Sequence, residues 1–195
     1  MNLSPLQLES AEYPLVSIKA NPSISKDRAE LALPLKVKAD VLYDSDGRHF
    51  AFLSIEQSDP EFAYSVELDV FAPFSIDVEG CKQAYKRAFN PEVVAVNVAR
   101  ILFSGAREMI SIVSARSPYG VARIPTLLLG PSDVEVAFEE GNLNKILVES
   151  FGFDEEQLAK ATQLAGKESL DSSEGGISKR SPEAQAKKSK SKQKG

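Results

Sequence analysis

One stretch of this chain constrains its fold more than any other, the residues from Pro91 to Ser117, PEVVAVNVARILFSGAREMISIVSARS. Its polar side chains recur every three or four residues, which predicts one polar stripe along an α-helix. Nearly all other positions are apolar, so the apolar arc is much wider than the roughly 100° that a surface helix buries. A helix of this kind, about 40 Å long at the α-helical rise, needs protein on at least two sides, and we predict that it forms the centre of an oligomer. The polar stripe comprises Asn97, Arg100, Ser104, Arg107, Ser111 and Ser114.

Four apolar residues of this helix are expected at or beside a subunit interface, because one domain cannot cover every side of it. We interpret Arg107 and Glu108 as a salt bridge or as contacts along the polar stripe, not as a ligand site, because buried ions are normally paired for structural reasons. The mid-helix Gly105 costs about 1 kcal/mol in helix propensity, which predicts a close approach by another helix or strand. The interface residues are Ile101, Leu102, Met109 and Ile110.

Before this helix, the sequence predicts an antiparallel meander of about four strands. Residues 33–43 alternate between apolar and polar side chains, and residues 48–57 and 64–70 do the same. Short turn sequences join these segments, which favours antiparallel neighbours. Residues 6–20 form a further strand that Pro14 interrupts. Because proline cannot donate to a central ladder, this strand lies at an edge or contains a bulge.

The remaining elements are short. Residues 71–76 are expected to end the sheet, and residues 80–89 to form a short helix. The apolar residues 124–130 are too few for a helix and are closed by a proline. Residues 143–151 and 155–164 have amphipathic helical patterns. The fold class is therefore α+β, with a four-stranded β-meander, one long helix and shorter C-terminal helices.

The charge of the chain divides it into two parts. The chain has 195 residues and a net charge of −5, but residues 166–195 contain eight Lys or Arg and four Asp or Glu, a charge of +4, which leaves −9 for the rest. We predict one domain over residues 1–165 and a disordered, basic Lys/Ser-rich tail over residues 166–195. An acidic body argues against nucleic acid as the main partner. Without a signal peptide or an apolar run of membrane-spanning length, a cytoplasmic location with no membrane insertion is expected.

The inventory of reactive side chains argues against an enzyme. The chain has one histidine, His49, and one cysteine, Cys81. A metal site needs several clustered ligands, and these residues cannot supply them. The nucleotide-binding and hydrolase motifs are absent. We interpret Cys81 as a packed thiol and His49 as a surface imidazole, not as a nucleophile and its base, and we expect no cofactor.

The order of these elements and a few motifs resemble the SecB family of protein-export chaperones. The motifs are Phe74-Ser75-Ile76, then Ile101-Leu102-Phe103 with Ala106-Arg107-Glu108, and the apolar segment from Ile124 to Gly130 before Pro131. The resemblance covers roughly residues 6–138. It implies a homotetramer, a dimer of dimers with the long helices between two sheets. It also implies ATP-independent holding of unfolded or nascent polypeptides in apolar grooves.

The resemblance assigns the grooves to apolar residues near the end of the sheet and in the C-terminal segments. In family members that deliver clients to the SecA motor, acidic residues on the first and fourth strands form the docking surface. Here Leu15 and Lys19 stand at the first-strand positions, and only Glu67 keeps the acidic character. Other SecB-like proteins hold an antitoxin of a toxin–antitoxin pair, and this branch suits the changes better. The client-binding residues are Phe71, Phe74, Leu127, Leu129, Phe138, Leu143, Leu147 and Phe151.

Two functions of different classes follow from the sequence. The first is an ATP-independent holdase for protein export or for a dedicated client such as an antitoxin. The alternative is a non-catalytic adaptor or scaffold that binds one folded partner through its acidic sheet. A small hydrolase that uses carboxylates ranks below both.

Overall fold

The computed structural model describes residues 4–25, 31–85, 90–154 and 156–159. The predicted basic tail, residues 166–195, and most of the predicted helix over residues 155–164 lie outside the described residues. Residues 1–158 form one compact unit, and the elements below belong to it. The predicted α+β class is confirmed, since these residues form one mixed sheet and a long helix.

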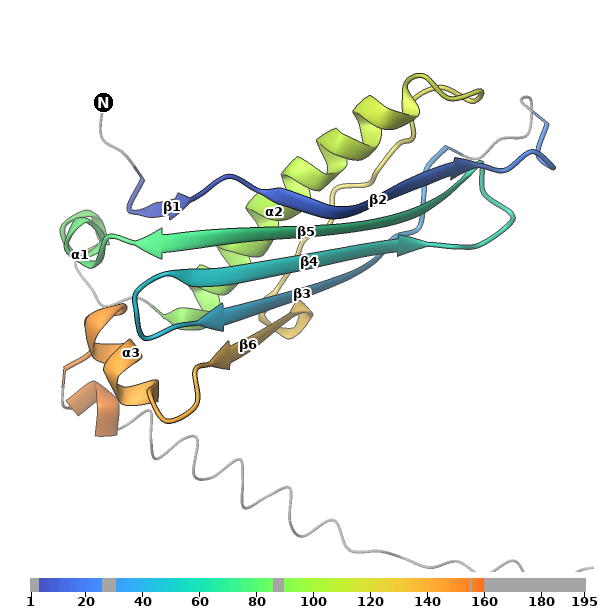
Figure 1. Ribbon diagram of the computed structural model, residues 1–195. Helices are drawn as coiled ribbons and strands as arrows, with labels where there is room; N and C mark the ends of the chain where they lie inside the picture. Colours follow the sequence, from blue (N-terminus) through green and yellow to red (C-terminus); the bar gives the residue numbers. More distant parts are fainter. Residues whose placement is uncertain (1–3, 26–30, 86–89, 155, 160–195) are drawn as a thin grey trace, which may run out of the picture. The chain divides into compact units, whose positions relative to one another are not determined.

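The sheet has six strands among the described residues, in the order β1-β5-β4-β3-β6, with β2 also paired to β5 (Figure 1). Strands β1 and β2 follow one another along the same edge of β5, so each of them is an edge strand. The other edge is β6, which pairs with β3 in parallel, whereas all the other pairs are antiparallel. The strands are β1 (Leu6–Leu8), β2 (Glu12–Ala20), β3 (Lys36–Tyr43), β4 (His49–Gln57), β5 (Tyr64–Ile76) and β6 (Val134–Phe138).

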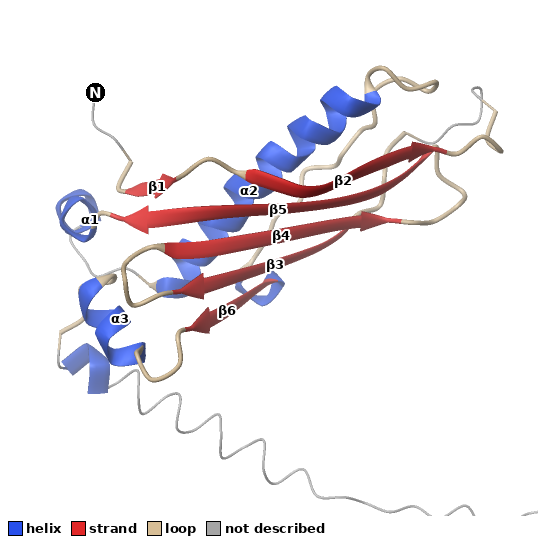
Figure 2. Ribbon diagram, in the orientation of Figure 1, coloured by secondary structure: helices blue, strands red, loops and turns tan. Residues whose placement is uncertain are grey.

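One face of the sheet is covered by helix α2 (Pro91–Ser114), which crosses the strands on one side (Figure 1). The helix starts with Pro91 at its first position, and the Asn90 side chain accepts hydrogen bonds from the backbone of Glu92 (2.8 Å) and Val93 (3.4 Å). These features favour a helix start, because proline suits the first turn and asparagine satisfies free backbone donors. After α2, residues 115–133 return to the sheet without a strand or α-helix of their own (Figure 2). We call residues 115–133 the connecting segment.

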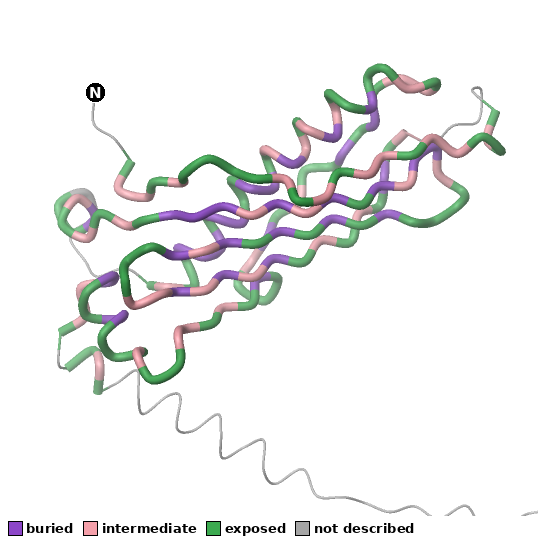
Figure 3. Tube along the Cα trace, in the orientation of Figure 1, coloured by how far each residue is buried: buried purple, intermediate pink, exposed green. Residues whose placement is uncertain are grey.

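Strict alternation along the strands builds the core between the sheet and α2 (Figure 3). Every second residue of β4 and β5 is buried, and α2 buries the side that faces the sheet. Successive side chains of a strand point to opposite faces, so the other residues form a second face that α2 does not cover. We call this second face the open face. The core between the sheet and α2 includes Val41, Leu53, Ile55, Val66, Leu68, Val70, Val98, Leu102, Ala106 and Ile110.

Two prolines mark irregular points of the sheet. The pairing of β2 with β5 shifts between Glu12 and Leu15, around Pro14, which confirms the predicted edge strand with a bulge. The second proline, Pro73, lies inside the central strand β5, where its carbonyl accepts a hydrogen bond from the backbone of Glu9 at 2.9 Å. Because the N–H and C=O of one strand residue point to the same side, the missing N–H of Pro73 faces the break between β1 and β2. No ladder bond to β4 is lost.

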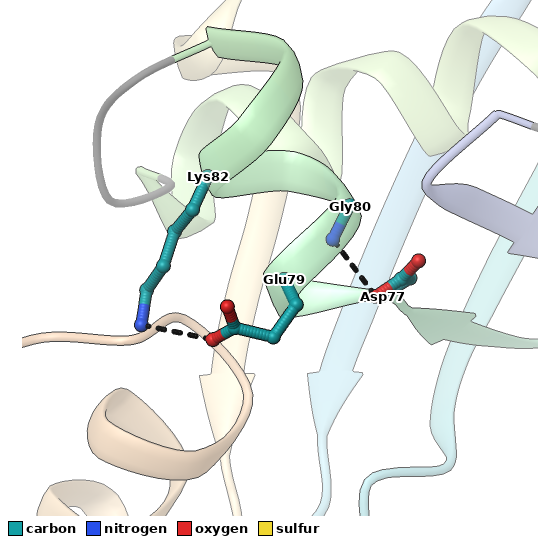
Figure 4. A network of polar contacts seen from close by, with 4 residues as sticks. All are labelled: Asp77, Glu79, Gly80 and Lys82. Atoms are coloured by element: carbon teal, nitrogen blue, oxygen red, sulfur yellow. Dashed lines mark hydrogen bonds and ion pairs between the residues drawn. The ribbon is translucent and has the colours of Figure 1, made fainter.

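Two short helices stand near the end of the sheet at which β5 finishes (Figure 1). Helix α1 (Val78–Tyr85) begins with the Asp77 carboxylate accepting from the backbone of Gly80 at 2.9 Å, and Lys82 lies 3.4 Å from Glu79 one turn earlier (Figure 4). Helix α3 (Leu143–Glu149) follows β6. Helix α1 starts two residues before the short helix predicted over residues 80–89, whose last four residues lie outside the described residues, and α3 lies within the amphipathic pattern over residues 143–151. A 3₁₀ turn over Pro131–Asp133 precedes β6.

The structure corrects the sequence predictions in three details. Strand β6 was missed, because five residues of alternating pattern are a weak signal. Residues 71–76 do not end the sheet but continue β5 to its pairing with β1. His49 is not a surface imidazole: it starts β4 on the α2 side and is fully buried.

The mid-helix glycine has the predicted close neighbour. A side chain at Gly105 would place its first carbon 3.3 Å from the hydroxyl of Tyr13, at the start of β2. Glycine therefore leaves room for the Tyr13 side chain of the edge strand against α2, which offsets its low helix propensity.

Candidate functional site

The side of α2 that faces away from the sheet exposes large apolar side chains. Val93 is 50% exposed, Ile101 49% and Ile112 61%. Asn97, Ser104 and Glu108 are also exposed, so this outer face of α2 is a mixture of apolar and polar groups. Isolated apolar side chains are normal on a protein surface, but a row of them along one long helix marks an interaction surface.

The four residues predicted at or beside a subunit interface divide between the two sides of α2. Ile101 is exposed and Met109 is half-buried. Leu102 and Ile110 are buried in the core of the same chain. A second copy of the chain can therefore contact Ile101 and Met109 directly, whereas Leu102 and Ile110 lie beneath that surface.

The connecting segment is held in place mainly through its backbone. Arg123 donates its backbone N–H to the carbonyl of Leu31 at 2.7 Å and accepts from the N–H of Leu33 at 3.1 Å. The Arg100 side chain of α2 donates through Nε and Nη2 to the carbonyl of Leu129, at 3.1 and 2.6 Å. The segment consequently keeps an extended course and leaves some side chains free to point outward. Leu128 is 87% exposed, Val121 is also exposed, and Leu127 is half-buried.

A cleft of about 460 Å³ lies between α2 and the connecting segment. It is lined from α2 by Ser104, Arg107, Glu108 and Ser111, and from the segment by Arg123 and Ile124. The Nε atom of Arg107 is buried and has no hydrogen-bond partner among the described residues. Of the two alternatives expected for Arg107 and Glu108, the salt bridge is absent from the ion pairs of the described residues, and contacts along the polar stripe stay a prediction. We call this cleft the arginine cleft.

Aromatic rings gather where α3 meets the end of the sheet. The ring centre of Tyr43 lies 4.8 Å from that of Phe151, 5.3 Å from Phe138 and 6.0 Å from Phe74. The Tyr43 hydroxyl donates to the carbonyl of Pro91 at 2.6 Å, which joins this aromatic cluster to the start of α2. Edge-to-face rings of this kind stabilise packing beyond the area that they bury. The cluster fixes α3 and the residues after it against the sheet.

His49 belongs to the same aromatic cluster. Its ring stacks on Phe151, with the centres 6.2 Å apart and the planes at 19°. Its Nδ1 accepts the backbone N–H of Asp44 at 3.2 Å, and its Nε2 is buried without a partner among the described residues. Burial lowers the pKa of His49 to about 4, and the charge of Asp44 opposes this shift only in part. The imidazole is therefore neutral at physiological pH.

The open face of the sheet contains a second aromatic group. Phe71 of β5 lies 4.9 Å from Phe52 and 5.9 Å from Phe50 of β4, measured between ring centres, and Phe52 is 45% exposed. Acidic residues are cross-strand neighbours of these rings, with Glu12 opposite Phe71 and Asp40 opposite Phe52, and Lys36 and Lys38 lie on the same face. Among the described residues, the ion pairs leave out the carboxylates of Glu12, Glu56, Glu67 and Asp69.

The eight residues predicted to bind clients do not form one surface. Phe74, Phe138 and Phe151 meet in the aromatic cluster. Phe71 belongs to the open face, which is the opposite side of the sheet. Four of the eight are buried: Phe74, Leu129, Leu147 and Phe151. Leu127, Phe138 and Phe71 are half-buried, and Leu143 is exposed. The exposed Val121, Leu128, Ile101 and Ile112 were not among the predicted client contacts, although their position beside the predicted segment and helix was a usable signal.

The side chains that could serve catalysis or bind a metal are few and lie apart in the described part of the chain. In the part of the chain that the structure describes, no group of three or more His, Cys, Asp or Glu side chains could hold a metal ion. Cys81 is a buried thiol in α1, and burial raises its pKa to about 11. His49 and Cys81 belong to different surroundings, since His49 contacts the aromatic cluster and Cys81 lies near Leu6, Ile76 and Val94. Within the described residues, no helix is long and apolar enough to cross a membrane.

Comparisons with known proteins give a structural likeness. No family model matches the sequence, and no curated protein matches it. Among solved structures, the fold is similar to that of a SecB-like chaperone of Mycobacterium tuberculosis, solved in complex with a ChAD peptide from the HigA1 antitoxin. The identity is 13%, the TM-score is 0.45, and the match covers 64% of this chain and 92% of that one.

Proposed function

We propose that this protein is an ATP-independent holdase that binds unfolded polypeptide clients on an apolar surface formed by several copies of the chain. The observation that carries the proposal is the set of large apolar side chains exposed along α2 and the connecting segment, next to a well-packed core. Exposed apolar residues gathered in one region mark an interaction surface. The set comprises Val93, Ile101, Ile112, Val113, Val121 and Leu128.

Assembly is the first part of the proposal. The sheet covers one side of α2, and Ile101 and Ile112 face away from it. They are 11 residues apart, about three helical turns, so both point to the same side. A second copy that packs on this side would bury both, and a pair of such dimers would give the tetramer that the resemblance implies. Outside this contact, the connecting segment stays accessible.

Client binding is the second part. The connecting segment is extended and fixed through its backbone, and its exposed apolar side chains can contact an unfolded chain that has no fixed shape. Leu128 and Val121 are the contacts we propose first, with Leu127 beside them. The buried predicted contacts, Phe74 and Phe151 among them, would reach a client only in a state in which α3 has left the sheet. The clients are exported proteins or one dedicated client such as an antitoxin, and Glu67 is the residue through which SecA would dock.

The test measures the aggregation of an unfolded client and the size of the assembly. The wild-type chain should suppress the aggregation of an unrelated unfolded enzyme at stoichiometric amounts and without nucleotide. Leu128→Ser combined with Val121→Ser should weaken suppression several-fold and keep the oligomer intact. Ile101→Arg should shift light scattering towards smaller species, because it places an unpaired charge in the contact. Val148→Ser is the matched control, since Val148 is an exposed apolar residue of α3 outside the proposed surfaces.

Two results would refute the proposal. The first is a monomeric wild type. The second is suppression that survives the double serine variant unchanged. A pull-down from the native host, read by mass spectrometry, identifies the client and shows whether SecA is among the partners.

A second candidate, an adaptor that binds one folded partner, is favoured by the open face. The rings of Phe50, Phe52 and Phe71 lie together there beside unpaired carboxylates, which suits a partner with apolar and basic groups. Phe52→Ser would abolish the binding of such a partner and leave the suppression of aggregation intact. Loss of suppression with Phe52→Ser would instead place clients on the open face.

A further inference from the structure

We propose that the arginine cleft binds a carboxylate of the client, so that this protein prefers unfolded segments in which an acidic residue is flanked by apolar ones. The inference rests on the proposed function and specifies the chemistry of its ligand. It starts from the cleft of about 460 Å³ between α2 and the connecting segment.

The two arginines of the cleft lack the partners that such residues normally have. Neither Arg107 nor Arg123 forms an ion pair within the described part of the chain. The Nε of Arg107 is buried and makes no hydrogen bond there. A buried donor without a partner is costly, and few such groups occur in native proteins. Arg107 as a whole is only half-buried, so a rotation of its side chain towards the cleft would bring this donor to an external acceptor.

A third arginine of the same region shows the contrast. Arg100 uses Nε and Nη2 to bind the carbonyl of Leu129, so its side chain has a structural task. Arg107 has no such contact, although it stands two helical turns further along the same side of α2. Arg123 is exposed, but its backbone is fixed on both sides by Leu31 and Leu33. Its side chain therefore starts from a defined position at the rim of the cleft.

The charge of the lining indicates which anion fits. Two guanidinium groups and the carboxylate of Glu108 give a net charge of +1, which one monoanionic carboxylate neutralises. A dianionic phosphate would instead leave an excess negative charge beside Glu108. Guanidinium groups bind carboxylates through paired, charge-assisted hydrogen bonds. Apolar side chains stand on the same segment, with Val121 two residues before Arg123 and Leu128 five residues after it. The ligand should consequently have apolar residues next to its acid.

Two labelled peptides test the inference by fluorescence anisotropy with the full-length protein. Both are unstructured and rich in Leu and Ser; one has a single central Glu, and the other has Gln at that position. Wild type should bind the Glu peptide about tenfold more tightly, as expected for one charge-assisted contact. The preference should shrink as salt is added, because charged contacts at a partly open cleft are screened.

Variants assign the preference to the cleft. Arg107→Gln and Arg123→Gln should each reduce the preference for Glu to nearly none and leave the affinity for the Gln peptide unchanged. Arg116→Gln is the matched control: Arg116 is an exposed arginine outside the lining, so its loss removes the same charge and should keep the preference. Thermal unfolding checks that each variant is folded. Arg123→Gln keeps the test informative if Arg107→Gln does not fold.

The outcomes separate this inference from the proposed function. Equal binding of the two peptides to wild type would refute the carboxylate site and leave the holdase intact. A preference that Arg116→Gln loses as well would refute it too, because general charge would then be the cause. If Arg107→Gln changes the size of the assembly and not the peptide preference, the cleft serves a second copy of the chain. If neither peptide binds and no unfolded client is held, the proposed function itself fails.

Discussion

Acidification should destabilise the folded protein through one residue, His49. The imidazole is packed among Tyr43, Phe74 and Phe151. In the neutral form, its Nδ1 accepts the backbone N–H of Asp44. An added proton would abolish this acceptor and place a charge in an apolar cluster. The Asp44 carboxylate is the acidic group that opposes the effect, and it does so only in part.

The size of this destabilisation follows from the difference between the pKa of His49 in the unfolded chain and in the folded chain. His49 has a pKa near 6.5 when unfolded and about 4 in the fold. Between these values the unfolded chain binds a proton that the folded chain does not, so stability falls as the pH drops through this window. At pH 5 the loss is about 2 kcal/mol, from 1.36 kcal/mol for each pH unit below the unfolded pKa. Above about pH 7, His49 adds no pH dependence.

Urea unfolding at fixed protein concentration measures the effect in wild type and in His49→Phe. The variant loses the Asp44 hydrogen bond at every pH, so only the pH dependence is compared. Between pH 7.5 and pH 5, wild type should lose about 2 kcal/mol more stability than the variant. Carboxylates that titrate at low pH affect both proteins alike. The chain has one histidine, so NMR can follow its titration directly. Equal losses in the two proteins, or a His49 signal that titrates near pH 6.5 in the folded state, would refute this reasoning.

Two further changes test what fixes the helices. Asn90→Ala should lower the free energy of unfolding by about 1 kcal/mol, because the Asn90 side chain caps α2, and Asn90→Asp should restore most of it in urea unfolding. Phe151→Ala should cost about 3–5 kcal/mol, because the ring is fully buried in the aromatic cluster. Phe153→Ala is its control, since Phe153 is half-buried and two residues away. Similar losses for Phe151→Ala and Phe153→Ala would contradict the central place of Phe151.

Elements with a long, regular pattern could be predicted from the sequence. Strands β3, β4 and β5 alternate strictly because one face packs against α2 and the other does not. Helix α2 follows from its apolar periodicity and ends three residues before the predicted Ser117. The bulge around Pro14 could also be predicted, because proline lacks a backbone donor whatever the partner strand is.

Elements that depend on distant partners could not be predicted in this way. Strand β6 has five residues, and its place is set by parallel pairing with β3, about 95 residues earlier in the chain. Pro73 is tolerated inside β5 only because the chain between β1 and β2 leaves that edge unpaired. The burial of His49 depends on Phe151 of the C-terminal part. None of these partners can be read from the residues next to β6, Pro73 or His49.

The same limit explains why the candidate site was predicted only in outline. Periodicity shows that α2 is apolar on several sides but not which side its own sheet covers, because Leu102 and Ile110 are as apolar as Ile101 and Ile112. The polar stripe does not decide the matter either. Its last member, Ser114, is buried: its hydroxyl donates to the carbonyl of Ile110 at 2.7 Å and accepts the N–H of Ala122 at 2.9 Å.

Ser114 therefore ties the start of the connecting segment to α2. Solvent does not reach Ser114 at this end of the stripe. The exposed side of α2 includes Ile101 and Ile112 instead. The connecting segment runs along the neighbouring flank of α2, where Arg100 binds it. Ser104 and Glu108 belong both to the outer face of α2 and to the lining of the arginine cleft, so the assembly surface and the ligand cleft adjoin along one helix. Ile101→Arg should act on the size of the assembly, and Arg107→Gln should act on the peptide preference, because Ile101 lies outside the lining of the cleft and Arg107 lies within it.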